Sequence, residues 1–141
     1  PKTEAIGQIG HLSRWPIVIS GAIAIVVGVI VTGAGPHAGD ANTPRNGLSL
    51  EIWQHYHSYP AYAMTGLMVI AFASQWQLHR TWSVSVRALG IGTLIALLQA
   101  IIGIWQARTG VPALLVGIHM LGAALLCSAI AFQALALKRR Y

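Results

Sequence analysis

The sequence predicts an all-α, integral membrane four-helix bundle. The chain has 141 residues, of which 55% are hydrophobic and only 9% are charged, and its mean hydropathy is +0.63. A water-soluble domain carries about 25% charged residues, so the composition excludes that class. The apolar residues also gather in four segments, each long enough to cross a bilayer as a helix of about 20 residues.

The four predicted helices lie at about residues 15–34, 50–77, 83–107 and 112–137. Pro16 and Pro112 stand near helix starts, where the missing N–H is tolerated. Pro60 lies within the second segment and predicts a kink or one of the first helical turns. Together these segments form one predicted transmembrane domain, 15–137, between an amino end at 1–14 and a basic tail at 138–141.

The connections predict how the helices pair. Residues 35–49, "GPHAGDANTPRNGLS", are rich in Gly, Pro, Asn and Asp and predict an ordered polar loop. The other two connections, "HRTWS" and "RTGVP", are short, so consecutive helices should pack antiparallel. Gly92, Ala96 and Ala100 repeat at four-residue spacing, as in helices that approach closely in membranes. "VGVIVTGAG" at the end of the first segment also resembles "IGIWQARTG" at the end of the third, which suggests two related helix pairs.

The charges indicate topology and do not indicate a nucleic-acid partner. Nine Lys and Arg outnumber three acids, but the basic residues stand between and beyond the apolar segments, so the expected partner is the lipid bilayer. Seven of them lie at the amino end, the second connection and the carboxyl end: Lys2, Arg14, Arg80, Arg87, Lys138, Arg139 and Arg140. By the positive-inside rule, we expect a multi-pass protein of the cell membrane with both termini cytoplasmic.

Two further features bear on processing and redox state. The chain begins at Pro1 and not at a methionine, which indicates a fragment or a processed chain. The first apolar segment is too long for the core of a signal peptide. The single cysteine, Cys127, lies in the last apolar segment and is expected to be a small packing residue.

Two of the six histidines, His57 and His119, are expected at the same depth in the membrane. His57 follows Leu50 by seven residues and His119 follows Pro112 by seven, which places both roughly 10 Å below their helix starts. His55 would point roughly 200° away from His57 around the helix. An ionisable ring inside a membrane is costly unless it is paired, so His57 and His119 are candidate ligands of one metal ion.

Haem iron suits this pair better than zinc does. Zinc needs four protein ligands, or three and a water, whereas haem iron takes two axial ligands because the porphyrin supplies four nitrogens. Small residues one turn after each histidine (Pro60 and Ala61, Gly122 and Ala123) are expected to leave room for a flat ring. The alternative is that each histidine merely forms hydrogen bonds to a neighbouring helix.

Other polar residues near the expected outer edge have weaker assignments. Arg45 and Arg108 stand where haem propionates would emerge and are candidate cofactor-binding residues, or else ordinary boundary residues. His37 is expected to order the loop or to lie near a bound polar group. His11 and His79 lie at the opposite boundary, where interfacial residues are common.

Three stretches carry a resemblance to a known family: "VIVTGAGPHAGD", "QHYHSYPAYAMTG" and "QARTGVPALLVGIHMLGAAL". Over about residues 15–137 the chain resembles the carboxyl-terminal four-helix half of actinobacterial-type haem A synthases. The resemblance implies half of an eight-helix fold and an oxidoreductase that converts the methyl group of haem O to the formyl group of haem A, for cytochrome oxidase. It also implies that His57 and His119 hold a haem b used for electron transfer.

The resemblance also implies partners for this chain and implies that its role is not catalytic. The substrate, haem O, would bind the absent amino-terminal half, and the implied partners include a haem O synthase or an electron donor. Gln54 stands one turn before His57, where the catalytic half of the family has Glu, so no catalytic residue is expected in this chain. Two alternatives stay open: a small bis-histidine b-type cytochrome that serves as an electron-transfer subunit, and a cofactor-free assembly subunit of a respiratory complex.

Overall fold

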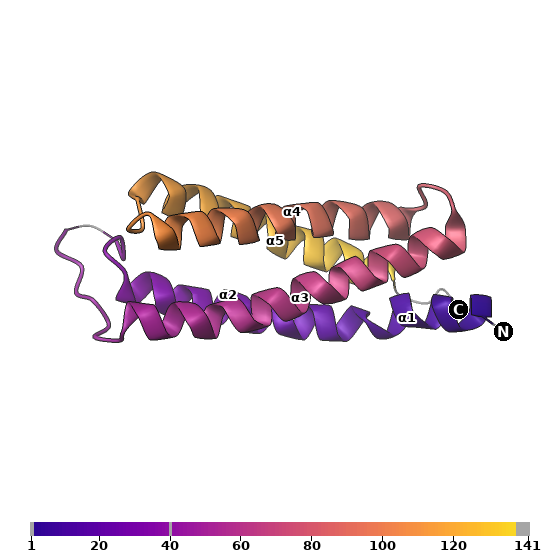
Figure 1. The fold of residues 1–141 in the computed structure, drawn as a ribbon, viewed down its shortest axis with the longest axis horizontal. Helices are drawn as coiled ribbons and strands as arrows, with labels where there is room; N and C mark the ends of the chain where they lie inside the picture. Colours follow the sequence, from indigo (N-terminus) through magenta and orange to yellow (C-terminus); the bar gives the residue numbers. More distant parts are fainter. Residues whose placement is uncertain (1, 40, 138–141) are drawn as a thin grey trace.

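The computed structural model of this chain describes residues 2–39 and 41–137, and within them it contains five α-helices and no strand. The predicted basic tail, 138–141, lies outside the described residues. The helices, shown in Figure 1, are α1 (Lys2–Leu12), α2 (Arg14–Ala34), α3 (Leu50–His79), α4 (Val84–Arg108) and α5 (Ala113–Ala136).

Four of these helices match the predicted segments to within two residues at each end, because local signals mark their starts. The side chains of Ser49 and Ser83 accept hydrogen bonds from the backbone N–H groups of Ile52 and Val86 at the starts of α3 and α4. Pro112 precedes α5. The fifth helix, α1, was not expected from the sequence, because its eleven residues are too few to span a membrane.

Among the described residues, three helical segments are long and apolar enough to cross a membrane: Gly7–Ala34, Val84–Arg108 and Ala113–Ala136. This agrees with a helical membrane bundle. The remaining predicted span, α3, is the longest helix at 30 residues. Its first half contains Glu51, Gln54, His55 and His57, which lower its apolar content, so a fourth span is not supported by composition.

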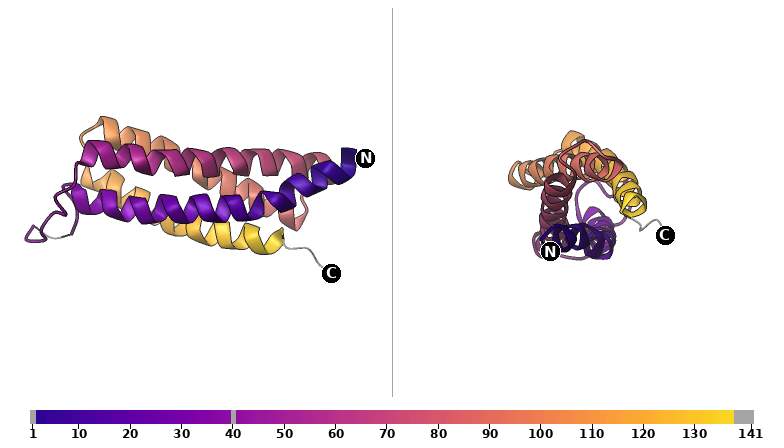
Figure 2. Two further views of the ribbon diagram at one scale, coloured as in Figure 1. Left: turned by 90° about the horizontal axis from the view of Figure 1, so that it is seen from below. Right: turned by 90° about the vertical axis from the view of Figure 1, so that its right-hand side faces the viewer.

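The helices form two antiparallel pairs that close into a ring. α2 packs on α3 and α4 packs on α5, while α3 also contacts α4 and α2 also contacts α5. α3 and α5 therefore face each other across the axis of the bundle (Figure 2). α1 packs mainly against α3. We call the end that holds residues 35–49 the loop end and the opposite end the α1 end; α5 ends at the α1 end, as Figure 1 shows.

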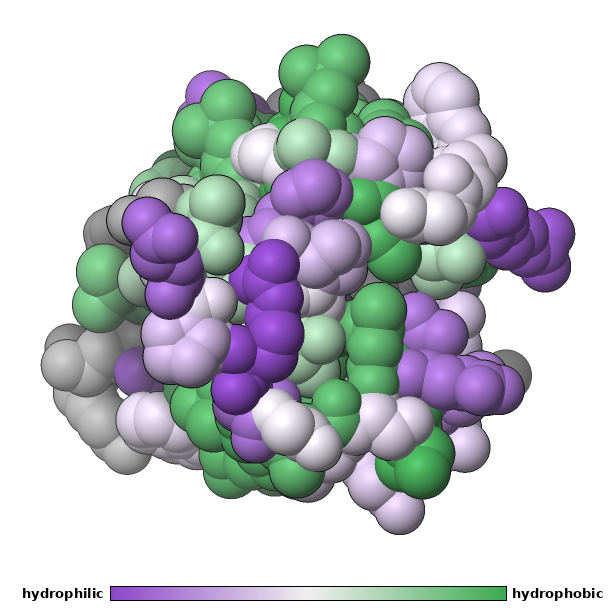
Figure 3. All heavy atoms as spheres, turned by 90° about the vertical axis from the view of Figure 1, so that its left-hand side faces the viewer, coloured by the Kyte–Doolittle hydropathy of each residue, from purple (hydrophilic) through white to green (hydrophobic). Residues whose placement is uncertain are grey.

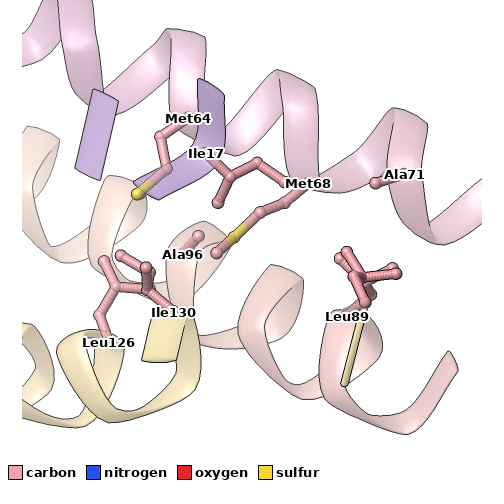
Figure 4. Close-up of a cluster of buried hydrophobic side chains, with 9 residues drawn as sticks. Ile17, Met64, Met68, Ala71, Leu89, Ala96, Leu126 and Ile130 are labelled. Atoms are coloured by element: carbon pink, nitrogen blue, oxygen red, sulfur yellow. The ribbon is translucent and has the colours of Figure 1, made fainter. Parts of the chain in front are cut away.

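The buried core occupies only the half of the bundle toward the α1 end. Its residues are Ile17, Met64, Met68, Ala71, Leu89, Ala96, Leu126, Ile130 and Leu137, most of which Figure 4 shows. Gly21 and Gly92 allow close approach here, because a Cβ on Gly21 would lie 2.6 Å from Ile130 and one on Gly92 would lie 3.4 Å from Met68. Gly92 and Ala96 of the predicted small-residue ridge are buried, whereas Ala100 is half-buried.

The other half of the bundle has no such core. Within residues 25–34, 50–63, 100–108 and 113–125, which form the loop-end parts of the four long helices, no residue is buried. In Figure 1 the α2–α3 and α4–α5 pairs diverge toward this end. Figure 3, which looks onto the loop end, shows hydrophilic residues across much of the face, interspersed with apolar ones. The side chains of this half therefore form no buried core.

Replacing Met68 with alanine is expected to lower the free energy of unfolding by about 2–5 kcal/mol. Met68 is 0% exposed and lies at the centre of the core, so its loss leaves a cavity. Thermal unfolding in detergent, followed by circular dichroism, measures the change. Met120 is 54% exposed, and Met120→Ala is the matched control, with an expected change within about 0.5 kcal/mol. Equal losses in the two variants would contradict this placement of the core.

Candidate functional site

The structure brings His57 and His119 together across the bundle axis. His57 lies on α3 and His119 on α5, and their ring centres are 6.2 Å apart with the ring planes at 80°. Both residues are half-buried and both stand on the loop-end side of the core. The expectation that two histidines distant in sequence share one depth in the bundle agrees with this geometry.

The backbone of α2 holds the His57 ring. His57 Nδ1 donates to the carbonyl oxygen of Ala24 at 2.8 Å. Because a carbonyl only accepts, the proton of the neutral ring is on Nδ1, which leaves Nε2 with a free lone pair. Gly28 follows Ala24 by one turn, and a Cβ on Gly28 would lie 3.0 Å from the ring carbon Cε1. The absence of a side chain at Gly28 therefore lets the ring lie against α2.

The His119 ring lies against α4 in a similar way. A Cβ on Gly103 would lie 3.2 Å from Cε1 of His119. Gln99, one turn before Gly103, donates from Nε2 to the backbone oxygen of His119 at 2.9 Å. His119 Nδ1 is buried and has no hydrogen-bond partner in the structure, in contrast to His57 Nδ1.

The two helix pairs repeat one arrangement. Gly28 and Gly103 hold the same second position in the related stretches "VGVIVTGAG" and "IGIWQARTG", and each lies against one histidine. Core residues also follow the histidines at equal distances. These are Met64 and Met68, seven and eleven residues after His57, and Leu126 and Ile130, seven and eleven after His119. The stretches that resemble each other in sequence therefore hold equivalent positions in the two helix pairs, α2–α3 and α4–α5.

The structure changes the expected role of Gly122. A Cβ at Gly122 would collide with the amide of Gln99, so this glycine makes room for Gln99 and not for a flat ring. Pro60, Ala61 and Ala123 are half-buried. Sequence reasoning missed Gly28, Gly103 and Gln99, although the internal resemblance pairs the two glycines.

The two arginines lie at the loop end. Arg45 is exposed and donates from its guanidinium to the backbone oxygen of Pro36, which holds the loop together. Arg108 is exposed in the last turn of α4. The predicted order of the loop agrees with the hydrogen bonds of Asn46, which donates to the carbonyl oxygens of Ile30 and Gly33.

The remaining histidines lie away from the pair. His11 Nδ1 donates to the backbone oxygen of Leu137 at 3.0 Å and so links the end of α1 to the end of α5. His37 is exposed in the loop and His55 is exposed on α3. His79 is the last residue of α3, at the α1 end.

His57 and His119 are two imidazoles that could serve together as ligands of one metal centre. Among the described residues, no group of three or more His, Cys, Asp and Glu side chains could hold a metal ion. Two histidines that held one metal ion between them, each through a metal–nitrogen bond of about 2 Å, would have their ring centres roughly 6 Å apart. The observed 6.2 Å is close to this separation.

Comparison with protein-family models, curated proteins and solved structures finds no match to this chain.

Proposed function

We propose that the chain binds a haem b through His57 and His119 and that it is the haem b-binding half of a haem A synthase. The observation that carries this proposal is the separation of the two rings, 6.2 Å, in the half of the bundle that has no core of its own. Two imidazoles are a complete axial set for haem iron, but they are an incomplete set for zinc.

The protein's contribution is to orient the two ligands. The Ala24 carbonyl oxygen fixes the tautomer of His57, and Gly28 and Gly103 let the Cε1 edges of the two rings lie close to α2 and α4. A bis-histidine haem b, when bound, takes up and releases single electrons.

The role in haem A synthesis rests on the resemblance of the quoted stretches. Gln54 stands one turn before His57 and is an amide, which neither holds nor moves a proton at the membrane depth of the site. We therefore assign electron transfer to this chain. The oxidation of the haem O methyl group belongs to a second, amino-terminal half, with electrons delivered by a separate donor.

The proposed orientation places the α1 end in the cytoplasm. Arg14, Arg80 and Arg87 gather at the α1 end, and Arg45 and Arg108 lie at the loop end. By the positive-inside rule, the haem site then lies in the outer half of the cell membrane. We assign Arg45 and Arg108 to pair with the propionates of the haem, because a guanidinium pairs well with a carboxylate.

A small b-type cytochrome is the second candidate, because both ligands come from one chain. The third reading, a cofactor-free assembly subunit, is favoured by a different fact: an edge-to-face contact of two histidine rings is also a stable arrangement without iron.

Spectroscopy of the full chain separates these readings. We expect the chain, produced in cells that make haem and purified in detergent, to give the sharp α band of a low-spin b haem on reduction. A pyridine haemochrome assay should then find one haem b per chain. A preparation that is helical by circular dichroism but has no Soret or α band would contradict both haem proposals and support the cofactor-free reading.

A second assay separates the enzyme from the cytochrome. The natural gene that encodes this chain is expressed in a host that accumulates haem O, and haem A is quantified by chromatography. Formation of haem A supports the synthase. A haem b band without haem A supports the cytochrome.

A further inference from the structure

The two histidines differ in how their second ring nitrogen is satisfied. His57 Nδ1 donates to Ala24, the residue one turn before Gly28 on α2. On α4 the corresponding residue, one turn before Gly103, is Gln99. His119 Nδ1, however, is buried without a partner. A ligating histidine almost always donates its other ring N–H to an oxygen acceptor, so an acceptor is required near His119 Nδ1.

Gln99 has an acceptor available at this place. It is 7% exposed, and its Nε2 already donates to the backbone oxygen of His119 at 2.9 Å. Its other amide atom, Oε1, is buried without a partner. Two unpaired buried groups, one donor and one acceptor, therefore occur on residues that are already joined by a hydrogen bond. Leaving such groups unpaired is costly.

Gly122 leaves room on α5 for the side chain of Gln99. Any side chain at this residue, which follows His119 by three, would collide with the Gln99 amide. Gln99 on α4 is thus matched by Gly122 on α5, at the point where the Gln99 side chain reaches the backbone of His119.

We propose that Gln99 is a positioning residue for His119: its Oε1 accepts the Nδ1 proton of the ring when the ring coordinates iron, while its Nε2 holds the α5 backbone. The inference rests on the proposed haem site. An acceptor on Nδ1 makes the imidazole a stronger donor, which favours ferric over ferrous iron. Gln99 therefore lowers the reduction potential of the haem as well as orienting its ligand.

The competing acceptor is Gln106. It lies on the same face of α4, seven residues after Gln99, and its Oε1 is also buried without a partner. Among the described residues, however, no hydrogen bond joins its side chain to His119. No glycine on α5 makes room for it as Gly122 does for Gln99. Gln106→Leu is thus the matched control for Gln99→Leu.

The test is a redox titration of the haem-loaded full chain and its variants in detergent. Gln99→Leu removes both amide contacts. We expect it to weaken haem retention about 10-fold and to raise the midpoint potential by about 30 mV, which is a threefold shift in the ferrous-to-ferric ratio for a one-electron couple. Gln99→Glu keeps an oxygen acceptor, so its potential should fall below that of the unmodified chain. Gln106→Leu should leave the potential unchanged.

The opposite signs of the potential shifts in Gln99→Leu and Gln99→Glu distinguish a residue that positions His119 from one that only packs against it. A shift of Gln99→Leu and Gln99→Glu in the same direction, an unchanged potential in both, or a shift carried by Gln106→Leu would each overturn the assignment to Gln99. If Gln99→Leu does not fold, the direction of the Gln99→Glu shift decides. A helical but haem-free unmodified chain would overturn the proposed function itself, and the inference with it.

Discussion

Replacing either His57 or His119 with alanine is expected to abolish haem retention. The two rings come from α3 and α5 and their centres lie 6.2 Å apart, so each would supply one side of the proposed axial pair. Removal of an outer-shell partner typically weakens metal binding 10–100-fold, and loss of a ligand should exceed roughly 100-fold. The ratio of Soret to protein absorbance in purified chain measures the loss.

His55→Ala is the control for this experiment. His55 lies on the same helix, two residues from His57, and it is exposed. The variant should keep a full complement of haem and an unchanged reduced spectrum. A low-spin haem spectrum that survives in both His57→Ala and His119→Ala would contradict the ligand assignment, and loss of haem in His55→Ala alone would move the ligand to His55.

Leucine at Gly28 or Gly103 is expected to displace a ligand ring and to weaken haem binding by about 10-fold or more. The new Cβ would lie 3.0 Å from Cε1 of His57 or 3.2 Å from Cε1 of His119, and the rest of the leucine needs further space. Overpacking of this kind costs about 1–3 kcal/mol. In Gly28→Leu the ring must also give up its bond to the Ala24 carbonyl oxygen. Haem titration and the spin state of the ferric form report the effect.

Two other helical glycines provide matched controls. A Cβ on Gly66 of α3 or on Gly117 of α5 would meet no atom within 4 Å. Gly66→Leu and Gly117→Leu should therefore bind haem as the unmodified chain does, with a slight gain in helix propensity. If they lose haem as fully as the Gly28 and Gly103 variants, the contact of glycine with ring is not the cause.

The sequence alone determined the helical class, four of the five helices and the common level of His57 and His119 in the bundle. Runs of apolar residues about 20 long, bounded by Ser49, Ser83 and Pro112, marked α2 to α5 because these signals are local. The equal spacing of His57 and His119 from their helix starts predicted their common depth, since the rise per residue in a helix is constant.

Only the tertiary structure showed which face of each helix points to the core and which helices lie next to each other. Helices that are apolar all round give no periodicity that points to the core, and residues such as Leu114 and Leu121 are exposed although they are as apolar as the core. The sequence therefore did not show that Gly28 and Gly103 lie against the histidines, that Gln99 fills the space at Gly122, or that the core occupies only one half of the bundle. These facts depend on pairing between residues far apart in the chain, which is set by side-chain packing between helices and not by local pattern.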